Sequence, residues 1–166
     1  MTAARQQRKR PFIIGLACVI ALGAGIFAPR AINAATDNQL TINSDTGLAI
    51  SGFDPVSYFT DGKAKFGRPE IELNKDGVVW RFSNEGNRGA FDLHPEIYAP
   101  RFGGYDPVAI GRDRSVRGHP LFWAVVGQRL YFFYSEKTRL AFLAEPGRII
   151  ATADRKWPDV SRALGE

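Results

Sequence analysis

The chain contains an internal duplication, and this feature limits its fold more than any other. The phrase DPV occurs at 54–56 and again at 106–108, an offset of 52 residues. RGAFDLHP at 88–95 is echoed by RLAFLAEP at 139–146, an offset of 51, and WRFS at 80–83 is echoed by FFYS at 132–135. Three related phrases in one order, with a slip of one residue, indicate two copies of a unit of about 50 residues.

Each copy is expected to contain the same elements. Its Asp-Pro pair favours a short helical turn, whose free backbone N–H groups the Asp side chain caps. An aromatic, β-branched strand follows, GVVWRFS in the first copy and RLYFFYS in the second, where FWAVV completes a hairpin. Ser83 or Ser135 then ends the strand and is expected to cap a helix. The stretch from Arg148 to Trp157 predicts a further amphipathic helix.

A single strand–helix unit is too small to bury its own apolar face, which gives a physical reason for two copies. The 12 Phe, 5 Tyr and 3 Trp are enough to build one packed core, into which one side of each aromatic strand is expected to point. The sequence therefore predicts a small, compact α+β domain of two similar strand–helix units over residues 47–160. We expect an antiparallel sheet core, short helices and a tail at 161–166.

The N-terminus has the pattern of an export signal. A basic segment, RQQRKR, precedes an uncharged apolar run from Pro11 to Ala28, and small residues follow. Residues 1–34 are either a signal peptide, cleaved after Ala34, or an anchor that attaches the protein to the membrane through residues 12–28. A linker at 35–46 follows. Both alternatives predict an exported domain, periplasmic or anchored in the cytoplasmic membrane and facing the periplasm.

Charge and sulfur content exclude several functions. The chain has 22 Lys and Arg against 17 Asp and Glu, but five of the basic residues lie before Ala35, where no acidic residue occurs. The remainder is formally neutral and shows no basic footprint for nucleic acid. Cys18 is the only cysteine and lies in the apolar run, so the expected domain has no disulfide and no cysteine-based metal site.

Several residues are candidates for a ligand pocket. Asp54 and Asp106 either cap their turns or form a pair of carboxylates that binds a cation or ligand. Phe102, Gly103, Gly104 and Tyr105, which lead into Asp106, either floor a small pocket or form a tight connection between the units.

Basic and imidazole side chains supply further candidates. Arg88 and Arg139 occupy equivalent positions and either clamp an anion, cover an aromatic ring or pair with a nearby carboxylate. His94 and His119 are either surface and capping residues or metal ligands. A metal site built on these histidines would need carboxylates from Asp92, Glu96, Asp106 or Asp113 to complete it.

The sequence also resembles the exported single-domain proteins of the YHS-domain family. The phrases that carry the resemblance lie between Leu48 and Pro158, and they are GLAISGFDPVSYFTDGKAKFG, WRFSNEGNRGAFDLHPEIYAPRFGGYDPVAI, RLYFFY and ATADRKWP. The resemblance implies a small α+β fold. Cysteine-bearing relatives are associated with metal handling. Family members commonly place a cysteine after the FGGY phrase, where this chain has Asp106, so a thiol-based role does not transfer.

These features together predict an exported YHS-domain protein that acts as a non-enzymatic small-ligand or metal-binding accessory module. Its partner would be a small ligand or a protein, and its cofactor, if any, a metal ion. Two alternatives remain open at this point. One is a membrane-anchored protein-interaction domain, and the other is an enzyme that uses Asp106 with His94 or His119 as acid and base.

Overall fold

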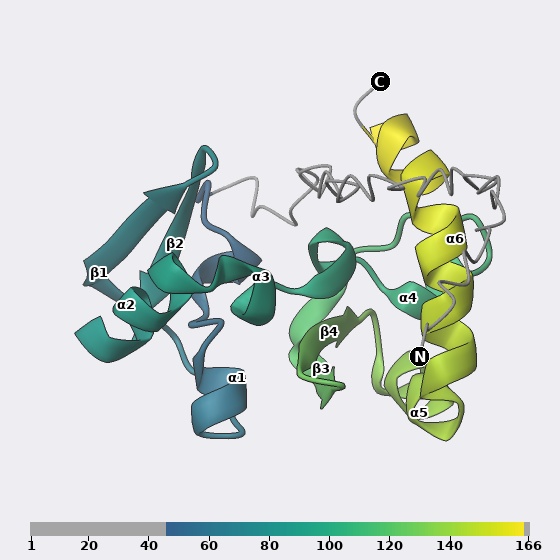
Figure 1. Cartoon of the computed structure of the whole chain (residues 1–166), viewed down its shortest axis with the longest axis horizontal. Helices are drawn as coiled ribbons and strands as arrows, with labels where there is room; N and C mark the ends of the chain where they lie inside the picture. The colour runs from purple at the N-terminus through teal and green to yellow at the C-terminus, as the bar shows by residue number, and fades with distance from the viewer. Residues whose placement is uncertain (1–45, 165–166) are drawn as a thin grey trace, which may run out of the picture. The chain divides into compact units, whose positions relative to one another are not determined.

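The structure is a computed structural model that describes residues 46–164 (Figure 1). The first repeat, residues 48–100, contains a 3-10 turn and five further elements: η1 (Ile50–Gly52), α1 (Ser57–Thr60), β1 (Arg68–Lys75), β2 (Val78–Phe82), α2 (Glu85–Leu93) and α3 (Pro95–Tyr98). The second repeat, residues 101–164, has the same order: η2 (Arg101–Gly104), α4 (Pro107–Ile110), β3 (His119–Val126), β4 (Arg129–Phe133), α5 (Glu136–Ala144) and α6 (Pro146–Leu164). The described residues therefore form an α+β domain with two antiparallel two-stranded sheets, as predicted.

The backbones of the two repeats agree in unusual details. Each 3-10 turn contains consecutive residues with positive φ, from Ile50 to Gly52 and from Phe102 to Gly104. Each hairpin has an irregularity at the same place, between Arg68 and Glu72 and between His119 and Trp123. These features rarely coincide by chance, and they confirm the duplication.

The strand register corrects one of the three sequence matches. β2 and β4 correspond at an offset of 51, so Trp80 is equivalent to Tyr131, and WRFS aligns with YFFY rather than with FFYS. The N-caps of the helices that follow the strands also correspond at this offset of 51. Ser135 caps α5 as expected, but the cap of α2 is Asn84, whose side chain accepts from the backbone N–H of Asn87. The sequence also gave no sign of β1, because its RPEIELNK segment is strongly polar.

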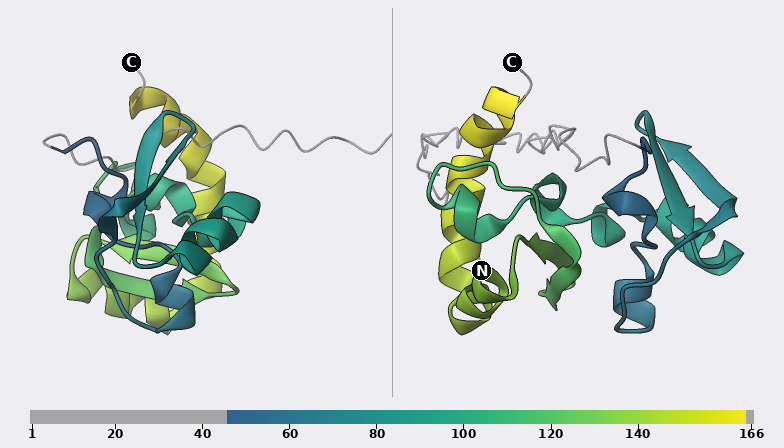
Figure 2. Two further views of the ribbon diagram at one scale, coloured as in Figure 1. Left: turned by 90° about the vertical axis from the view of Figure 1, so that its left-hand side faces the viewer. Right: turned by 180° about the vertical axis from the view of Figure 1, so that it is seen from behind.

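The two hairpins are buried differently. β2 alternates, with Val78, Trp80 and Phe82 facing the core. β4 is buried on both sides: Leu130 and Phe132 join the core of the first repeat, and Tyr131 and Phe133 join the core of the second. Figures 1 and 2 accordingly draw the β3–β4 hairpin between the first repeat and the helices α5 and α6. One-sided burial, expected for both aromatic strands, is therefore wrong for β4.

Tyr58 of α1 joins the two repeats. It is 2% exposed, its ring meets Trp123 edge-on at 5.1 Å and Phe132 at 5.4 Å, and its hydroxyl donates to the carbonyl of Pro120 at 3.1 Å. Burial, together with the nearby charge of Asp54, raises the pKa of Tyr58 well above its usual value. The interface between the repeats is thus a packed aromatic core with one buried hydrogen bond.

Helix α6 confirms the amphipathic helix predicted near the C-terminus, with wider bounds. Its buried residues, Ile149, Ala153, Trp157 and Val160, recur at helical spacing and cover the second core. It continues to Leu164, into the expected tail. Among residues 46–164, no helix has the length and apolarity needed to cross a membrane. The expected signal or anchor and most of the linker lie outside the described residues.

Candidate functional site

Asp54 is a buried structural carboxylate. Its Oδ1 accepts from the backbone N–H of Val56 at 2.9 Å, which is the bond predicted for the Asp-Pro turn, although the N-cap of helix α1 is Val56 itself. Its Oδ2 accepts from the backbone N–H and hydroxyl of Ser83, at 2.8 and 2.6 Å, and from the amide of Asn87 at 2.6 Å. Asp54 therefore ties the start of α1 to the junction between β2 and α2.

Asp106 repeats this arrangement with fewer partners. Its Oδ1 accepts from Val108 N–H at 2.8 Å, and its Oδ2 accepts from Tyr134 N–H at 2.9 Å. The side chain is fully buried, and both of these hydrogen bonds come from the backbone. This geometry is that of a cap and a strand tie, and it does not favour the alternative in which Asp106 acts as an acid or base with a histidine.

The loop before Asp106 is the tight connection rather than a pocket floor. Phe102 is 1% exposed and packs between Tyr131, at 6.2 Å, and Trp157, at 5.7 Å. Tyr105 also meets Trp157, at 5.8 Å. Gly103 and Gly104 supply the positive φ angles, 58° and 86°, that the turn requires. The aromatics of this loop belong to the core.

The two equivalent arginines make local ion pairs. Arg88 binds Glu85 at 2.6 Å, and Arg139 binds Glu136 at 2.7 Å, each with a carboxylate three residues earlier on its helix. The hydrogen bond from Arg139 lowers the pKa of Glu136. Of the three interpretations that the sequence left open, the structure shows pairing with a nearby carboxylate.

The histidines lie at segment boundaries, as their Pro neighbours predict. His94 is exposed and lies 3.4 Å from Glu96, while Nδ1 of His119 accepts from Leu121 N–H at 3.2 Å. Within residues 46–164 the structure brings together no group of three or more His, Cys, Asp or Glu side chains that could hold a metal ion. Of the four carboxylates that were expected to complete such a site, Asp92 pairs with Lys75, Asp113 pairs with Lys156 and Asp106 accepts from backbone N–H groups. Glu96 alone lies near a histidine, His94.

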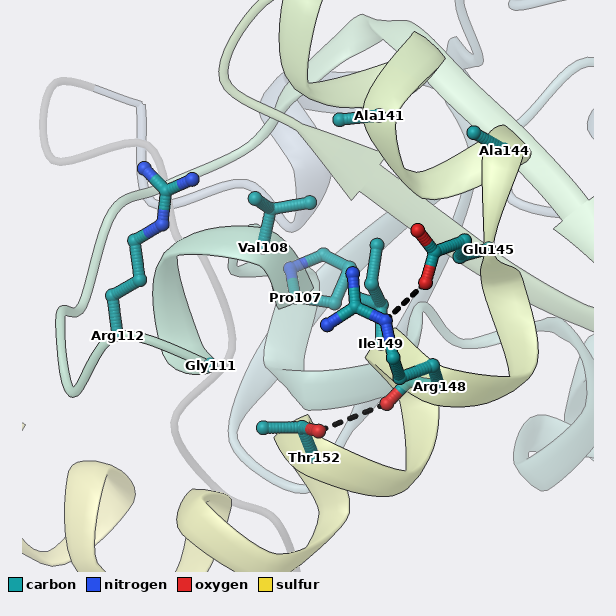
Figure 3. Close-up of a pocket in the computed structure, with 10 residues that line it drawn as sticks. All are labelled: Pro107, Val108, Gly111, Arg112, Ala141, Ala144, Glu145, Arg148, Ile149 and Thr152. Carbon is teal, nitrogen blue, oxygen red and sulfur yellow. Dashed lines mark hydrogen bonds and ion pairs between the residues drawn. The ribbon is translucent and has the colours of Figure 1, made fainter.

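The second repeat has a groove between α4, α5 and the start of α6, which we call groove A (Figure 3). Its volume is about 380 Å³. The apolar part of its wall is formed by Pro107, Val108, Ala141, Ala144 and Ile149, and the polar part by Arg112, Glu145, Arg148 and Thr152, with Gly111 between them. Arg148 is paired with Glu145, three residues earlier, and the Thr152 hydroxyl donates to the carbonyl of Arg148 at 2.9 Å.

The first repeat fills the equivalent space with its own side chains. Phe59 and Tyr98 stack edge-to-face there, with ring centroids 5.3 Å apart. At the offsets of 52 and 51, these positions become Gly111 and Ile149, both of which line groove A. Groove A is therefore open because the second repeat has lost one aromatic ring completely and exchanged the other for a smaller side chain.

A second groove, groove B, lies on the other side of α4. Its volume is about 370 Å³, and it is lined by Asp106, Val108, Ala109, Arg112, Arg114, Val116, Tyr134 and Thr138. In the first repeat, Ser57, Ser83 and Asn87 occupy the positions of Ala109, Tyr134 and Thr138, and all three bond to Asp54. In the second repeat Thr138 instead completes the capping box with Ser135. The side chains that close this corner in the first repeat are thus absent.

Both grooves were missed by sequence reasoning, although the duplication contained a signal. Asp106 is the only predicted pocket residue that lines either groove. An alignment of the repeats shows Phe59 replaced by Gly111 and Asn87 by Thr138. Which of these losses opens a space depends on packing, and the alignment does not contain that information.

Comparisons with protein-family models, with curated proteins and with solved structures found no match to this chain. The resemblance to the YHS-domain family therefore remains a hypothesis carried by the quoted phrases. The function has to be argued from the two grooves.

Proposed function

We propose that the domain is an exported, non-enzymatic module of the YHS type that binds a small ligand in groove A. The observation that carries this proposal is the pair Phe59 and Tyr98, which fills in the first repeat the space that is open in the second. A ligand would take the place of those rings. The volume of groove A, about 380 Å³, lies in the range of small-molecule sites.

The lining of groove A indicates the kind of ligand. The apolar wall favours a flat or compact apolar body, because contact with it removes apolar surface from water. The ion pair of Glu145 and Arg148 and the hydroxyl of Thr152 lie at one edge (Figure 3). They would orient a ligand that carries a polar group at one end.

The residue types that line the two grooves favour an accessory binding role over catalysis. The residues that line groove A include no Ser, Cys or His, the usual nucleophiles and bases. The buried carboxylate beside groove B, Asp106, is held by two backbone N–H groups. Binding of a small ligand requires only a groove of suitable shape and polarity, and groove A has both.

Thermal unfolding of the purified domain with indole or phenol tests the proposal, since these rings imitate the missing side chains. A compound that binds only the folded protein raises its melting temperature with concentration. The double variant Gly111→Phe/Ile149→Tyr restores the ring pair of the first repeat and should abolish this rise. Gly89→Phe makes the same glycine substitution on the exposed face of α2, where an added Cβ meets no atom within 4 Å, and serves as the control.

Two results would contradict the proposal. One is the absence of any saturable rise for a panel of small aromatic compounds. The other is a rise that persists unchanged in Gly111→Phe/Ile149→Tyr, which would place binding elsewhere. Native mass spectrometry of the exported protein adds an independent measurement, because it reports both a co-purified ligand mass and whether the mature chain starts near Ala35.

A further inference from the structure

The two repeats have diverged in charge. Residues 46–100 contain 6 Lys and Arg against 8 Asp and Glu, whereas residues 101–164 contain 11 against 6. The excess positive charge is thus confined to the repeat that carries both grooves. A copied unit keeps its fold if buried positions are kept, so a one-sided change of surface charge needs another explanation.

Three of the seven cations that lack a carboxylate partner among residues 46–164 lie on one loop. Most cations of the described residues have a carboxylate within 4.0 Å. Arg112, Arg114 and Arg117 have none among residues 46–164, and all three lie in the loop between α4 and β3. Asp113, the acidic residue of this loop, is paired with Lys156. The loop therefore presents three guanidinium groups that pair with no carboxylate of residues 46–164.

Two of these arginines line groove B. Arg112 and Arg114 line it together with Tyr134 and Thr138. The groove includes one carboxylate, Asp106, which is fully buried and accepts from two backbone N–H groups, so the side chains that line groove B carry a net charge of +1. Guanidinium groups bind carboxylates and phosphates through paired N–H donors.

We propose that groove B is a binding site for a small oxyanion, a carboxylate or a phosphate group, held by Arg112 and Arg114. This goes beyond the proposed function, because groove B can bind an anion whether or not groove A is occupied. The first repeat supplies the contrast. Its equivalent of Arg114 is Lys63, but the corner beside it is closed by the bonds of Ser83 and Asn87 to Asp54.

Titration with inorganic phosphate and with succinate, at constant ionic strength set with chloride, tests the site. Nitrogen-detected NMR of the arginine side chains follows Nε of Arg112 and Arg114, while thermal unfolding follows stability. We expect saturable shifts at both side chains and a rise in melting temperature. The double variant Arg112→Gln/Arg114→Gln should weaken binding at least about tenfold, since it removes both charge-assisted pairs.

Lys63→Gln is the matched control, because it removes the equivalent charge from the first repeat, and it should leave binding unchanged. The exposed arginines have no carboxylate partner in the described chain, so their replacement should not unfold the protein. Three results would overturn the proposal: shifts that do not saturate, binding that survives in Arg112→Gln/Arg114→Gln, or an equal loss in Lys63→Gln. Binding to anionic vesicles without binding to either small anion would also overturn it. Arg112 lines both grooves, whereas Arg114 lines groove B alone. Indole binding in groove A is therefore measured in the single variant Arg114→Gln, where its success or failure is separate from these four results.

Discussion

The first and second repeats share a backbone and differ in how completely their side chains fill it. Asp54 and Asp106 occupy the same place and both are fully buried, but Asp54 accepts four hydrogen bonds and Asp106 two. The first repeat closes both sides of its Asp-Pro turn. The second leaves a groove on each side of α4.

This difference separates what the fold requires from what it does not. The positive-φ turn, the cap of the Asp-Pro turn and the tie to the strand end occur in both repeats, so they belong to the scaffold. Two further features occur in the first repeat alone. One is the pair of side chains that bind Asp54, Ser83 and Asn87, and the other is the stacked ring pair of Phe59 and Tyr98. A binding site can arise at positions where one repeat packs its side chains and the other repeat has smaller ones.

The largest loss of stability is expected from substitutions at two equivalent glycines, Gly67 and Gly118. A Cβ at Gly67 would lie 2.4 Å from the backbone carbon of Arg81, and one at Gly118 would lie 2.5 Å from Cβ of Phe132. Gly67→Ala and Gly118→Ala should each lower the free energy of unfolding by about 4 kcal/mol or more, because strand and turn must separate. Chemical denaturation measures this, with Gly89→Ala as a control that meets no neighbour. Tolerance at one glycine alone would show that the two scaffolds are not equivalent.

Removal of either buried carboxylate should lower the free energy of unfolding, and the loss should be larger for the carboxylate that accepts more hydrogen bonds. Asp54→Ala leaves two backbone donors and two side-chain donors without their acceptor, and we expect a loss of about 3 kcal/mol. Asp106→Ala leaves two backbone donors, and we expect a loss of about 2 kcal/mol. Urea denaturation of the two variants compares them directly. Equal losses would mean that the bonds from Ser83 and Asn87 add nothing, and the contrast between a closed and an open corner would lose its energetic basis.

Much of the scaffold was predictable because its signals are local. The repeated phrases, the proline after each Asp and the helical spacing of α6 can each be recognised within a few residues of sequence. The same holds for the pairing of Arg88 and Arg139 with acidic neighbours three residues away. These interactions form within one element, so they depend little on the tertiary fold.

The parts that were missed depend on contacts between distant residues. Phe102 packs on Trp157, 55 positions later, and this contact makes it a core residue rather than a pocket wall. β4 is buried on both sides because the first repeat covers one face. Grooves A and B likewise arise from side chains that are missing at the meeting point of three elements. Sequence patterns alone do not contain that information.

A smaller loss of stability is expected from a substitution of Tyr58 at the contact between the repeats. Tyr58→Phe removes the hydrogen bond to the Pro120 carbonyl and should cost about 1 kcal/mol at neutral pH. Because burial raises the folded-state pKa of Tyr58 above its usual value of 10.0, its neutral form is favoured in the folded protein. This contribution is complete below pH 10 and is lost as the pH rises from 10 towards the folded pKa.

Urea denaturation between pH 7 and 11 measures both parts of this prediction. The free energy of unfolding of the natural protein should fall above pH 10, and that of Tyr58→Phe should fall less steeply. A residual slope is expected from Tyr131, whose pKa burial also raises. Identical slopes in the two proteins would mean that the hydroxyl of Tyr58 is hydrated, and that the repeats meet less tightly than the packing around Trp123 and Phe132 indicates.

The smallest effect, and the only stabilising one, is expected where the first repeat carries strain that the second avoids. Ser51 has a φ of 56° and is exposed, while the equivalent Gly103 has a φ of 58°. Glycine adopts this conformation without the steric cost that a Cβ brings, but it loses more entropy on folding. Ser51→Gly should therefore raise the free energy of unfolding by about 0.5 kcal/mol. Thermal unfolding would detect such a gain, and a loss of similar size would show that the chain entropy of glycine outweighs the relief of strain, so that the serine is the better residue for this turn.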